Sequence, residues 1–99
     1  MRQSVEIHFA ANHPVAAGHF PGNPIIPGAL LLDEVVRVLG REEHGLIIRS
    51  AKFFRPLRPG QSIRVEWQCL AGGVKKFECH LSGQGGLVAA GTVETGGEP

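Results

Sequence analysis

Three groups that could act on a thioester lie within fifteen residues of this sequence. His19 stands in a segment rich in proline and glycine, whose restricted backbone can hold an imidazole in place as a general base. A helix expected to begin at Gly28 has no Ser, Thr, Asp or Asn at the capping position, so its first N–H groups are free to polarise a carbonyl. Asp33 follows within this helix and could act as a general acid. These are the parts needed to remove a proton beside a thioester carbonyl and to expel a β-hydroxyl.

Each of these groups also has a simpler interpretation. A histidine in a loop is often only exposed or hydrogen-bonded, and a Pro-Gly pair can be a plain turn before a buried helix. Asp33 could pair with Arg37 one helical turn later, with Glu34, about 100° away around the helix, as an ordinary surface acid. If Asp33 instead lies among aliphatic side chains, desolvation would raise its pKa, as a general acid near neutral pH requires.

The remaining potential metal ligands are scattered along the chain. They are His8, His13, His44, His80, Cys69 and Cys79. The histidines show no ligand spacing to one another, and the cysteines form neither a CxxC pair nor a zinc motif. We therefore expect no metal site and no disulfide framework, with both cysteines in the core.

The composition is that of one small domain. Ninety-nine residues with 42% hydrophobic content can form a single core, so we expect one domain over residues 1–99. A core of this size is often stabilised by a second subunit. The net charge of +1 provides no basic field for binding nucleic acid. The charged N-terminus and the absence of a long apolar run predict a cytoplasmic protein without membrane insertion.

Hydrophobic periodicity and glycine or proline breaks divide the chain into one helix and five strands. The helix is expected over Gly28–Leu39, with Gly40 as its stop signal, after a long loop from Ala11 to Pro27. The strands are expected over about Ser4–Ala10, Leu46–Phe54, Ser62–Leu70, Lys75–Ser82 and Leu87–Thr95. The last four strands are expected to form an antiparallel meander. The helix is apolar nearly all round, so other parts of the protein must surround it.

These elements predict an α+β fold in which a curved antiparallel sheet of about five strands wraps one long central helix. That arrangement is the hot-dog fold, although the pattern also permits other small α+β sheets. Within the sheet, a shared core face for the third and fourth strands predicts pairing of Cys69 with Phe77 and of Trp67 with Cys79. A three-residue loop, Gly72 to Val74, would join them, and the two thiols would be diagonal neighbours too far apart for a disulfide.

The combined motif resembles a known family. His19-Phe20-Pro21-Gly22 is followed by Pro24, by Pro27-Gly28 and by the acid Asp33, a pattern similar to the signature of the hot-dog β-hydroxyacyl-[acyl-carrier-protein] dehydratases of the FabA/FabZ type. The stretch from Lys52 to Gly60 is similar to the strand-and-turn segment of the same family. The resemblance continues more weakly through the last strand and so covers nearly the whole chain.

The resemblance implies a role for each matching residue. His19 would remove the α-proton, and Asp33, from the other protomer of a homodimer with shared active sites, would handle the departing hydroxyl. The amides of Gly28 and Ala29 would bind the thioester oxygen, and the carbonyl of Ile25 would orient the His19 ring. The active-site loop would contain Phe20, Pro21, Gly22, Pro24 and Pro27.

The implied activity is a (3R)-3-hydroxyacyl-[acyl-carrier-protein] dehydratase that forms a trans-2-enoyl thioester without a cofactor. The acid is Glu in FabZ-like members and Asp in FabA-like ones, so Asp33 matches the second group while His19 to Gly22 matches the first. The subtype therefore stays open. The short chain resembles the compact dehydratases of aryl polyene and related specialised lipid pathways, and it implies that an N-terminal helix and one strand of longer members are missing.

A cluster of positive charges suggests a surface for the acidic acyl carrier protein. The residues are Arg49, Lys52, Arg55, Arg58 and Arg64, within a sixteen-residue stretch that contains no acid. Charge complementarity would guide a carrier protein to this surface. Ordinary solvated charges on strands and turns are the alternative explanation. Phe53 and Phe54 lie between these charges, but one short stretch does not indicate a nucleic-acid site.

Two other functions remain open. A hot-dog thioesterase would use an acid to direct water at the carbonyl and would not need His19. A non-catalytic acyl-binding subunit would keep the fold alone. His19 therefore separates the dehydratase from both alternatives.

Overall fold

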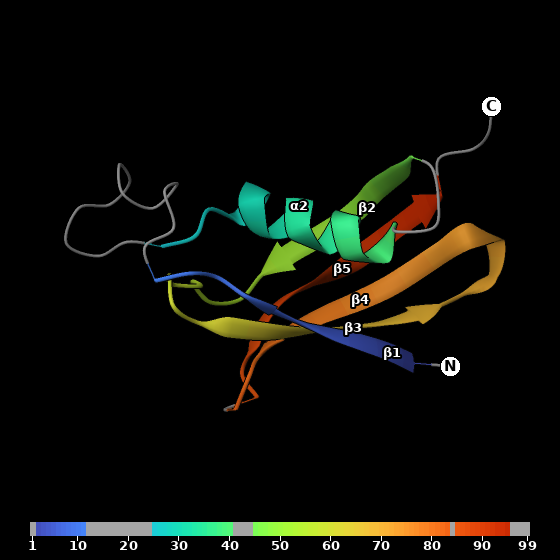
Figure 1. The fold of residues 1–99 in the computed structure, drawn as a ribbon. Helices are drawn as coiled ribbons and strands as arrows, with labels where there is room; N and C mark the ends of the chain where they lie inside the picture. Colours follow the sequence, from blue (N-terminus) through green and yellow to red (C-terminus); the bar gives the residue numbers. More distant parts are fainter. Residues whose placement is uncertain (1, 12–24, 41–44, 84, 96–99) are drawn as a thin grey trace.

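The computed structural model describes residues 2–11, 25–40, 45–83 and 85–95. The elements are β1 (Arg2–His8), α2 (Gly28–Leu39), β2 (Leu46–Phe53), β3 (Ser62–Cys69), the short 3₁₀ turn η1 (Ala71–Gly73), β4 (Val74–Leu81) and β5 (Leu87–Thr95). The helix lies against one face of a curved antiparallel sheet (Figure 1). The helix has the predicted bounds, and each predicted strand is present with ends that differ by two residues or fewer.

The sheet has the strand order β1-β3-β4-β5-β2. The predicted meander is correct for β3, β4 and β5, but it is wrong for β2, which pairs with β5 and not with β3. The segment after β2 crosses the sheet to reach β3, and β1 occupies the free side of β3. Strands β1 and β2 are therefore the two edges, and β2 lies beside α2 in Figure 1.

The predicted pairing of β3 with β4 is wrong by two residues. Trp67 pairs with Phe77 and Val65 pairs with Cys79. The connecting loop begins one residue earlier than predicted, because Gly72 and Gly73 both adopt positive φ (77° each) as its last two positions. A shift of two residues keeps every side chain on its predicted face, so the core face is still the expected one.

The core lies between the sheet and one side of α2. Leu31, Val35, Val38 and Leu39 are the buried helix residues, and they pack against buried side chains of β3, β4 and β5. The expectation that protein surrounds the helix is wrong within this chain. Ala29, Asp33 and Arg37, spaced four residues apart, form an exposed line along the helix.

The two cysteines have different environments. Cys79 is buried in the core, where desolvation raises the pKa of its thiol to about 12. Cys69 is exposed, so the expectation that both cysteines are core residues is wrong for Cys69. It pairs with Lys75 at the end of the hairpin, beyond Trp67, which is the last buried residue of β3.

Candidate active site

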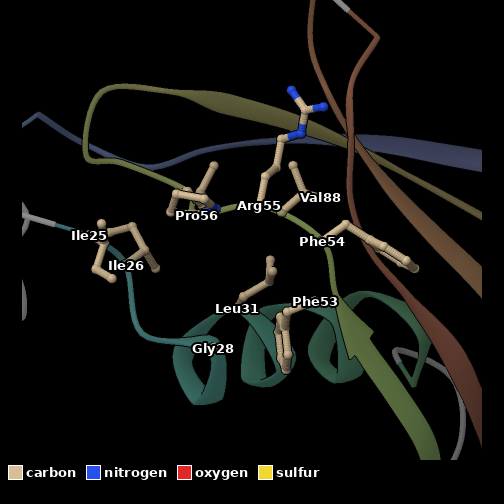
Figure 2. A pocket seen from close by; sticks show the side chains of 10 residues that line it. Ile25, Ile26, Gly28, Leu31, Phe53, Phe54, Arg55, Pro56 and Val88 are labelled. Carbon is tan, nitrogen blue, oxygen red and sulfur yellow. The ribbon is translucent and has the colours of Figure 1, made fainter.

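An apolar cavity of about 510 Å³ lies at the start of α2. Residues from four segments line it, among them Ile25, Gly28, Leu31, Phe53, Arg55 and Val88 (Figure 2). Of the described residues that line it, all except Gly28 and Arg55 have apolar side chains. A cavity with these walls suits the hydrocarbon part of a ligand.

An isolated backbone bridge positions the segment that leads into α2. The N–H of Ile26 donates to the carbonyl of Leu57 at 2.6 Å, and both side chains are buried. This bridge ties the residues before the helix to the segment that connects β2 with β3. It therefore places the N-terminus of α2 beside the end of β2.

The N-terminus of α2 has no side-chain cap, as predicted. Pro27 occupies the cap position with extended backbone angles, and the first turn contains no acid. The carbonyl of Pro27 accepts hydrogen bonds from the N–H groups of Leu30 (3.0 Å) and Leu31 (3.2 Å). Among the described residues, the N–H groups of Gly28 and Ala29 have no hydrogen-bond partner. Two bare amides at the positive end of a helix can stabilise negative charge on a carbonyl oxygen.

Phe53 covers this helix end. A Cβ atom built on Gly28 would lie 2.8 Å from Cζ of the Phe53 ring, which is closer than real Cβ contacts. Glycine at position 28 therefore allows the ring to rest directly on the first turn of the helix. The pattern of strands and helices did not predict this contact, because it joins residues of two elements that are distant in sequence.

Asp33 does not line the cavity of its own chain. Its side chain is exposed and has no hydrogen bond or ion pair among the described residues. The alternative ion pair with Arg37 is wrong, because Arg37 donates to Glu34 at 2.5 Å. Glu34 is therefore a partly exposed surface acid that forms the ion pair with Arg37. The idea that Asp33 lies among aliphatic side chains is also wrong within this chain.

The catalytic candidate His19 lies outside the described residues, as do Phe20, Pro21, Gly22 and Pro24 of the expected active-site loop. Their roles stay predictions. Ile25, the first described residue after them, is partly buried and lines the cavity. Its carbonyl stays the predicted partner of the His19 ring.

The predicted basic cluster is partly neutralised. Arg49 forms an ion pair with Glu94 on β5, and Arg64 forms one with Glu66 two residues along β3. The second pair was readable from the sequence, since residues two apart on a strand share a face. Lys52, Arg55 and Arg58 are exposed and have no carboxylate partner in the part of the chain that the structure describes.

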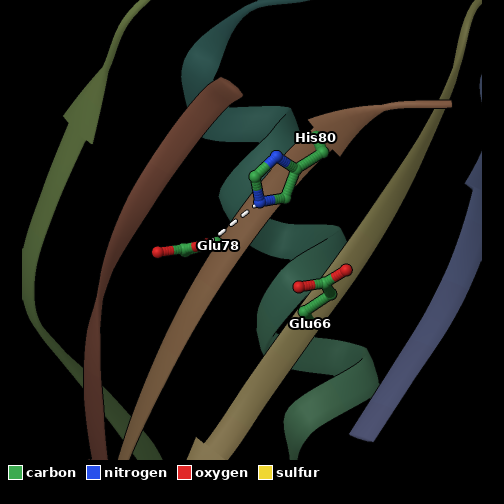
Figure 3. Close-up of side chains that lie close together, drawn as sticks. All are labelled: Glu66, Glu78 and His80. Carbon is green, nitrogen blue, oxygen red and sulfur yellow. Dashed lines mark hydrogen bonds and ion pairs between the residues drawn. The ribbon is translucent and has the colours of Figure 1, made fainter. Parts of the chain in front are cut away.

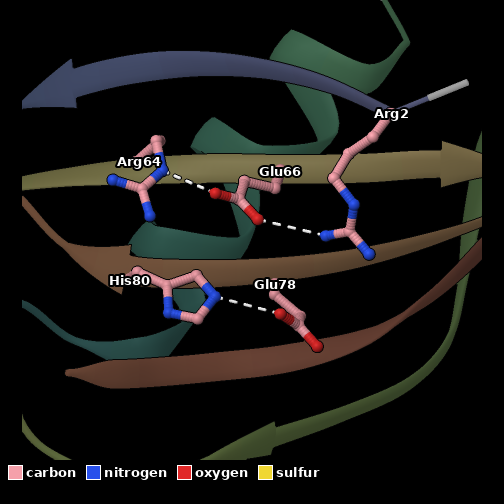
Figure 4. Close-up of polar contacts among 5 residues, drawn as sticks. All are labelled: Arg2, Arg64, Glu66, Glu78 and His80. Atoms are coloured by element: carbon pink, nitrogen blue, oxygen red, sulfur yellow. Dashed lines mark hydrogen bonds and ion pairs between the residues drawn. The ribbon is translucent and has the colours of Figure 1, made fainter. Parts of the chain in front are cut away.

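A polar network on the outer face of the sheet was not predicted. Glu66 accepts hydrogen bonds from Arg64 (2.6 Å) and Arg2 (3.1 Å), and His80 lies 2.9 Å from Glu78 (Figure 4). The hydrogen bond from Arg64 lowers the pKa of Glu66. The network depends on the observed register of β3 and β4, which places Glu66 opposite Glu78.

Three of these side chains have the chemistry of metal ligands. One ligand atom from each of Glu66, Glu78 and His80 lies within 4.8 Å of the others (Figure 3). Both carboxylates already have partners, since Glu66 binds two arginines and Glu78 binds His80. We assign no ion to this cluster, and the expectation of no metal site stays a prediction.

The curved five-stranded antiparallel sheet packed against α2 makes this chain a hot-dog-fold protein. A family model described as ApeI-like, ApeI dehydratase, matches residues 1–92. The chain therefore belongs to the ApeI-like dehydratase family. This confirms the resemblance to FabA/FabZ-type dehydratases that the sequence motif indicated.

Relatives with similar sequences carry a consistent name. The 3-hydroxyacyl-[acyl-carrier-protein] dehydratase FabZ of Wolbachia sp. subsp. Drosophila simulans (strain wRi) is 36% identical, over 83% of this chain and 66% of that protein. The FabZ of Chloroflexus aggregans is 43% identical, over 60% of this chain and 49% of that protein. The chain thus spans about half to two thirds of the length of these relatives.

Solved structures share the fold. The dehydratase heterocomplex ApeI:P from Xenorhabdus doucetiae has a TM-score of 0.77 and 20% identity, with 94% of this chain and 85% of that chain covered. An uncharacterized protein from Erwinia carotovora subsp. atroseptica has a TM-score of 0.78 and 21% identity, with 94% and 81% covered. At these identities the likeness concerns the fold. No helix among the described residues is long and apolar enough to cross a membrane.

Proposed function

We propose that this chain is a (3R)-3-hydroxyacyl-[acyl-carrier-protein] dehydratase that forms trans-2-enoyl thioesters in fatty acid or related lipid biosynthesis. The observation that carries the proposal is the uncapped start of α2, where Gly28 lines an apolar cavity. This arrangement offers hydrogen-bond donors to a thioester oxygen and apolar walls to its acyl chain. The family and the names of the relatives support the same activity. A cytoplasmic location is part of the proposal.

The proposed reaction removes one molecule of water. His19 takes a proton from C2 of the substrate, and the electron pair of that C–H bond becomes the C2=C3 double bond. The C3–O bond breaks, and Asp33 gives a proton to the departing hydroxyl, which leaves as water. The amides of Gly28 and Ala29 stabilise the charge that develops on the thioester oxygen while the proton leaves. A proton transfer from His19 to Asp33 restores both groups.

The proposed active site is shared between two copies of the chain. Asp33 is exposed and does not line the cavity of its own chain, so in this proposal it meets the substrate of a second copy that lies against the exposed line of α2. Strand β2 is an edge of the sheet and carries the exposed side chains of Ile47 and Ile48. Antiparallel pairing of two β2 edges would cover these side chains and continue the sheet.

Turnover of a medium-chain (3R)-3-hydroxyacyl thioester is the direct test. We expect the wild-type protein to form the conjugated enoyl thioester, and His19→Ala and Asp33→Asn each to lower kcat by about 10²-fold or more. Release of free thiol without an enoyl product would identify a thioesterase instead. Neither product from carrier-bound or CoA-bound substrate would identify a non-catalytic acyl-binding subunit.

Mixing two inactive variants tests the shared site. A dimer of one His19→Ala chain and one Asp33→Asn chain has one site in which both catalytic side chains are intact. Random exchange of subunits at equal amounts should therefore restore about one quarter of the wild-type activity. Light scattering of the unmixed proteins should give the mass of a dimer. No recovery after verified exchange, or a monomer at assay concentration, would refute the shared site.

The acyl carrier protein is the proposed partner. Arg49 is paired with Glu94, so the docking surface rests on the unpaired cations, and Lys52 and Arg58 are its exposed members outside the cavity. We expect Lys52→Glu combined with Arg58→Glu to weaken carrier-protein binding, with an effect that shrinks as salt concentration rises. Calorimetry with the acyl carrier protein measures this, and an unchanged affinity would exclude the surface.

A further inference from the structure

The arginines of this chain differ in their partners. Among the described residues, four arginines form ion pairs with glutamates: Arg2, Arg37, Arg49 and Arg64. Arg55 is exposed and has no hydrogen bond or ion pair among the described residues. Among the described residues, it is also the one charged residue that lines the apolar cavity. An unpaired guanidinium at such a cavity is available to an anionic group of a ligand whose other parts are apolar.

The guanidinium of Arg55 rests on a glycine. A Cβ atom built on Gly86 would lie 2.5 Å from Nη1 and 2.8 Å from Cζ of Arg55. The backbone of Gly86 does not adopt positive φ, so its conformation alone does not require glycine. The missing side chain leaves the space in which the guanidinium lies, next to the start of β5.

The charged group and the bare helix end lie on different sides of the cavity. In Figure 2 the Arg55 side chain extends away from the cavity wall on the side opposite Gly28. A ligand that contacts both the Arg55 guanidinium and the bare amides of α2 must carry an anionic group at one end and an uncharged polarisable group at the other, joined by a linker. Thioesters of phosphopantetheine have this form, because a neutral arm separates the thioester from the phosphate.

We propose that Arg55 binds the phosphate of a phosphopantetheine arm and that Gly86 positions its guanidinium for this contact. The inference rests on the proposed function, since that function supplies a thioester substrate. The planar guanidinium matches two phosphate oxygens with paired hydrogen bonds. Coenzyme A and acyl carrier protein both carry this phosphate, so the same contact serves either source.

The test compares thioesters that share one acyl group. The substrates are (3R)-3-hydroxyoctanoyl thioesters of pantetheine, of coenzyme A and of acyl carrier protein. We expect Arg55→Gln to lower the ratio of kcat/KM for each phosphate-containing substrate to that for the pantetheine substrate by about tenfold. Gly86→Ala keeps the charge but displaces it, and it should lower the same ratios by a smaller factor. Lys76→Gln, which removes an exposed cation from β4, controls for general electrostatic attraction.

A binding measurement without chemistry separates this inference from the proposed function. Free 4′-phosphopantetheine and pantetheine are titrated into the wild-type, Arg55→Gln and Lys76→Gln proteins and followed by NMR. We expect the wild type and Lys76→Gln to bind 4′-phosphopantetheine more tightly than pantetheine. We expect Arg55→Gln to bind the two with equal affinity. This result supports the phosphate contact even if the wild type forms no enoyl product.

Three outcomes would overturn the inference. Equal affinity of the wild type for both free arms would exclude a phosphate contact. An equal loss of kcat/KM on all three substrates would make Arg55 a structural residue. A loss restricted to the carrier-protein substrate would show that Arg55 contacts the carrier's surface and not the phosphate.

Discussion

The contact between Gly28 and Phe53 predicts an unusual response to a single methyl group. A Cβ at position 28 would lie 2.8, 3.0 and 3.3 Å from three atoms of the Phe53 ring, whereas ordinary contacts begin at 3.4 Å. The ring must therefore move by about 0.6 Å. It is 49% exposed, so it can swing toward solvent, which we expect to cost about 1 kcal/mol.

A second effect of Gly28→Ala has the opposite sign. Alanine in place of a glycine with compatible backbone angles stabilises a protein by about 0.4–1 kcal/mol, because it reduces the freedom of the unfolded chain. In the wild-type background the two effects nearly cancel. In a Phe53→Ala background the ring is gone, so Gly28→Ala should show the stabilisation alone. The two substitutions should therefore be coupled by about 1 kcal/mol.

Urea unfolding of the four proteins at one fixed protein concentration measures this coupling. The fixed concentration matters because the stability of a dimer depends on it. Equal effects of Gly28→Ala with and without the Phe53 ring would refute the reasoning, since the clash would then have no energetic consequence. The experiment needs no substrate, so it tests the packing at the start of α2 independently of any proposed activity.

Three further predictions concern the sheet. Gly91→Ala should destabilise the protein by about 2 kcal/mol or more in urea unfolding, because its Cβ would collide with the carbonyl oxygen of Ser50 on β2; a variant as stable as the parent would contradict this close approach. At neutral pH a thiol reagent should modify Cys69 but not Cys79, whose burial raises its pKa to about 12, so two fast-reacting thiols before denaturation would be the contrary result. The lowered pKa of Glu66 in the folded state means that its stabilising contribution is present above its ordinary pKa and is lost as pH falls through the folded value. Urea unfolding between neutral and acid pH should therefore show a steeper loss for the parent than for Glu66→Gln, and parallel curves would exclude that contribution.

The helix could be predicted to the residue because its signals are local. Pro27 starts it, apolar residues continue it, and Gly40 ends it with a hydrogen bond from its N–H to the carbonyl of Val36. The strands were predictable from alternation and from glycine turns for the same reason. Even so, alternation did not predict how far the apolar side chains of β1 are buried: Val5 is 37% exposed, whereas Phe9, just beyond the strand, is buried.

The order of the strands could not be predicted from such signals. The meander assumed that strands adjacent in sequence pair with each other, which failed for β2, because its partner is the last strand, β5. The register of β3 and β4 depended on which residues of the loop take positive φ, and a one-residue difference in the loop moved every pair by two. These features are determined by contacts between distant parts of the chain.

The candidate site shows the same division. The bare start of α2 was predictable, because the absence of a capping side chain is visible in the sequence. Which positive charges are ion-paired was not predictable. Arg49, for example, pairs with Glu94, a residue on another strand. Arg55 looked equivalent to Arg49 in the sequence, yet the sheet leaves Arg55 without a carboxylate among the described residues and places it at the cavity. Its proposed role in phosphate binding therefore follows from the tertiary arrangement, which decides which charges remain available to a ligand.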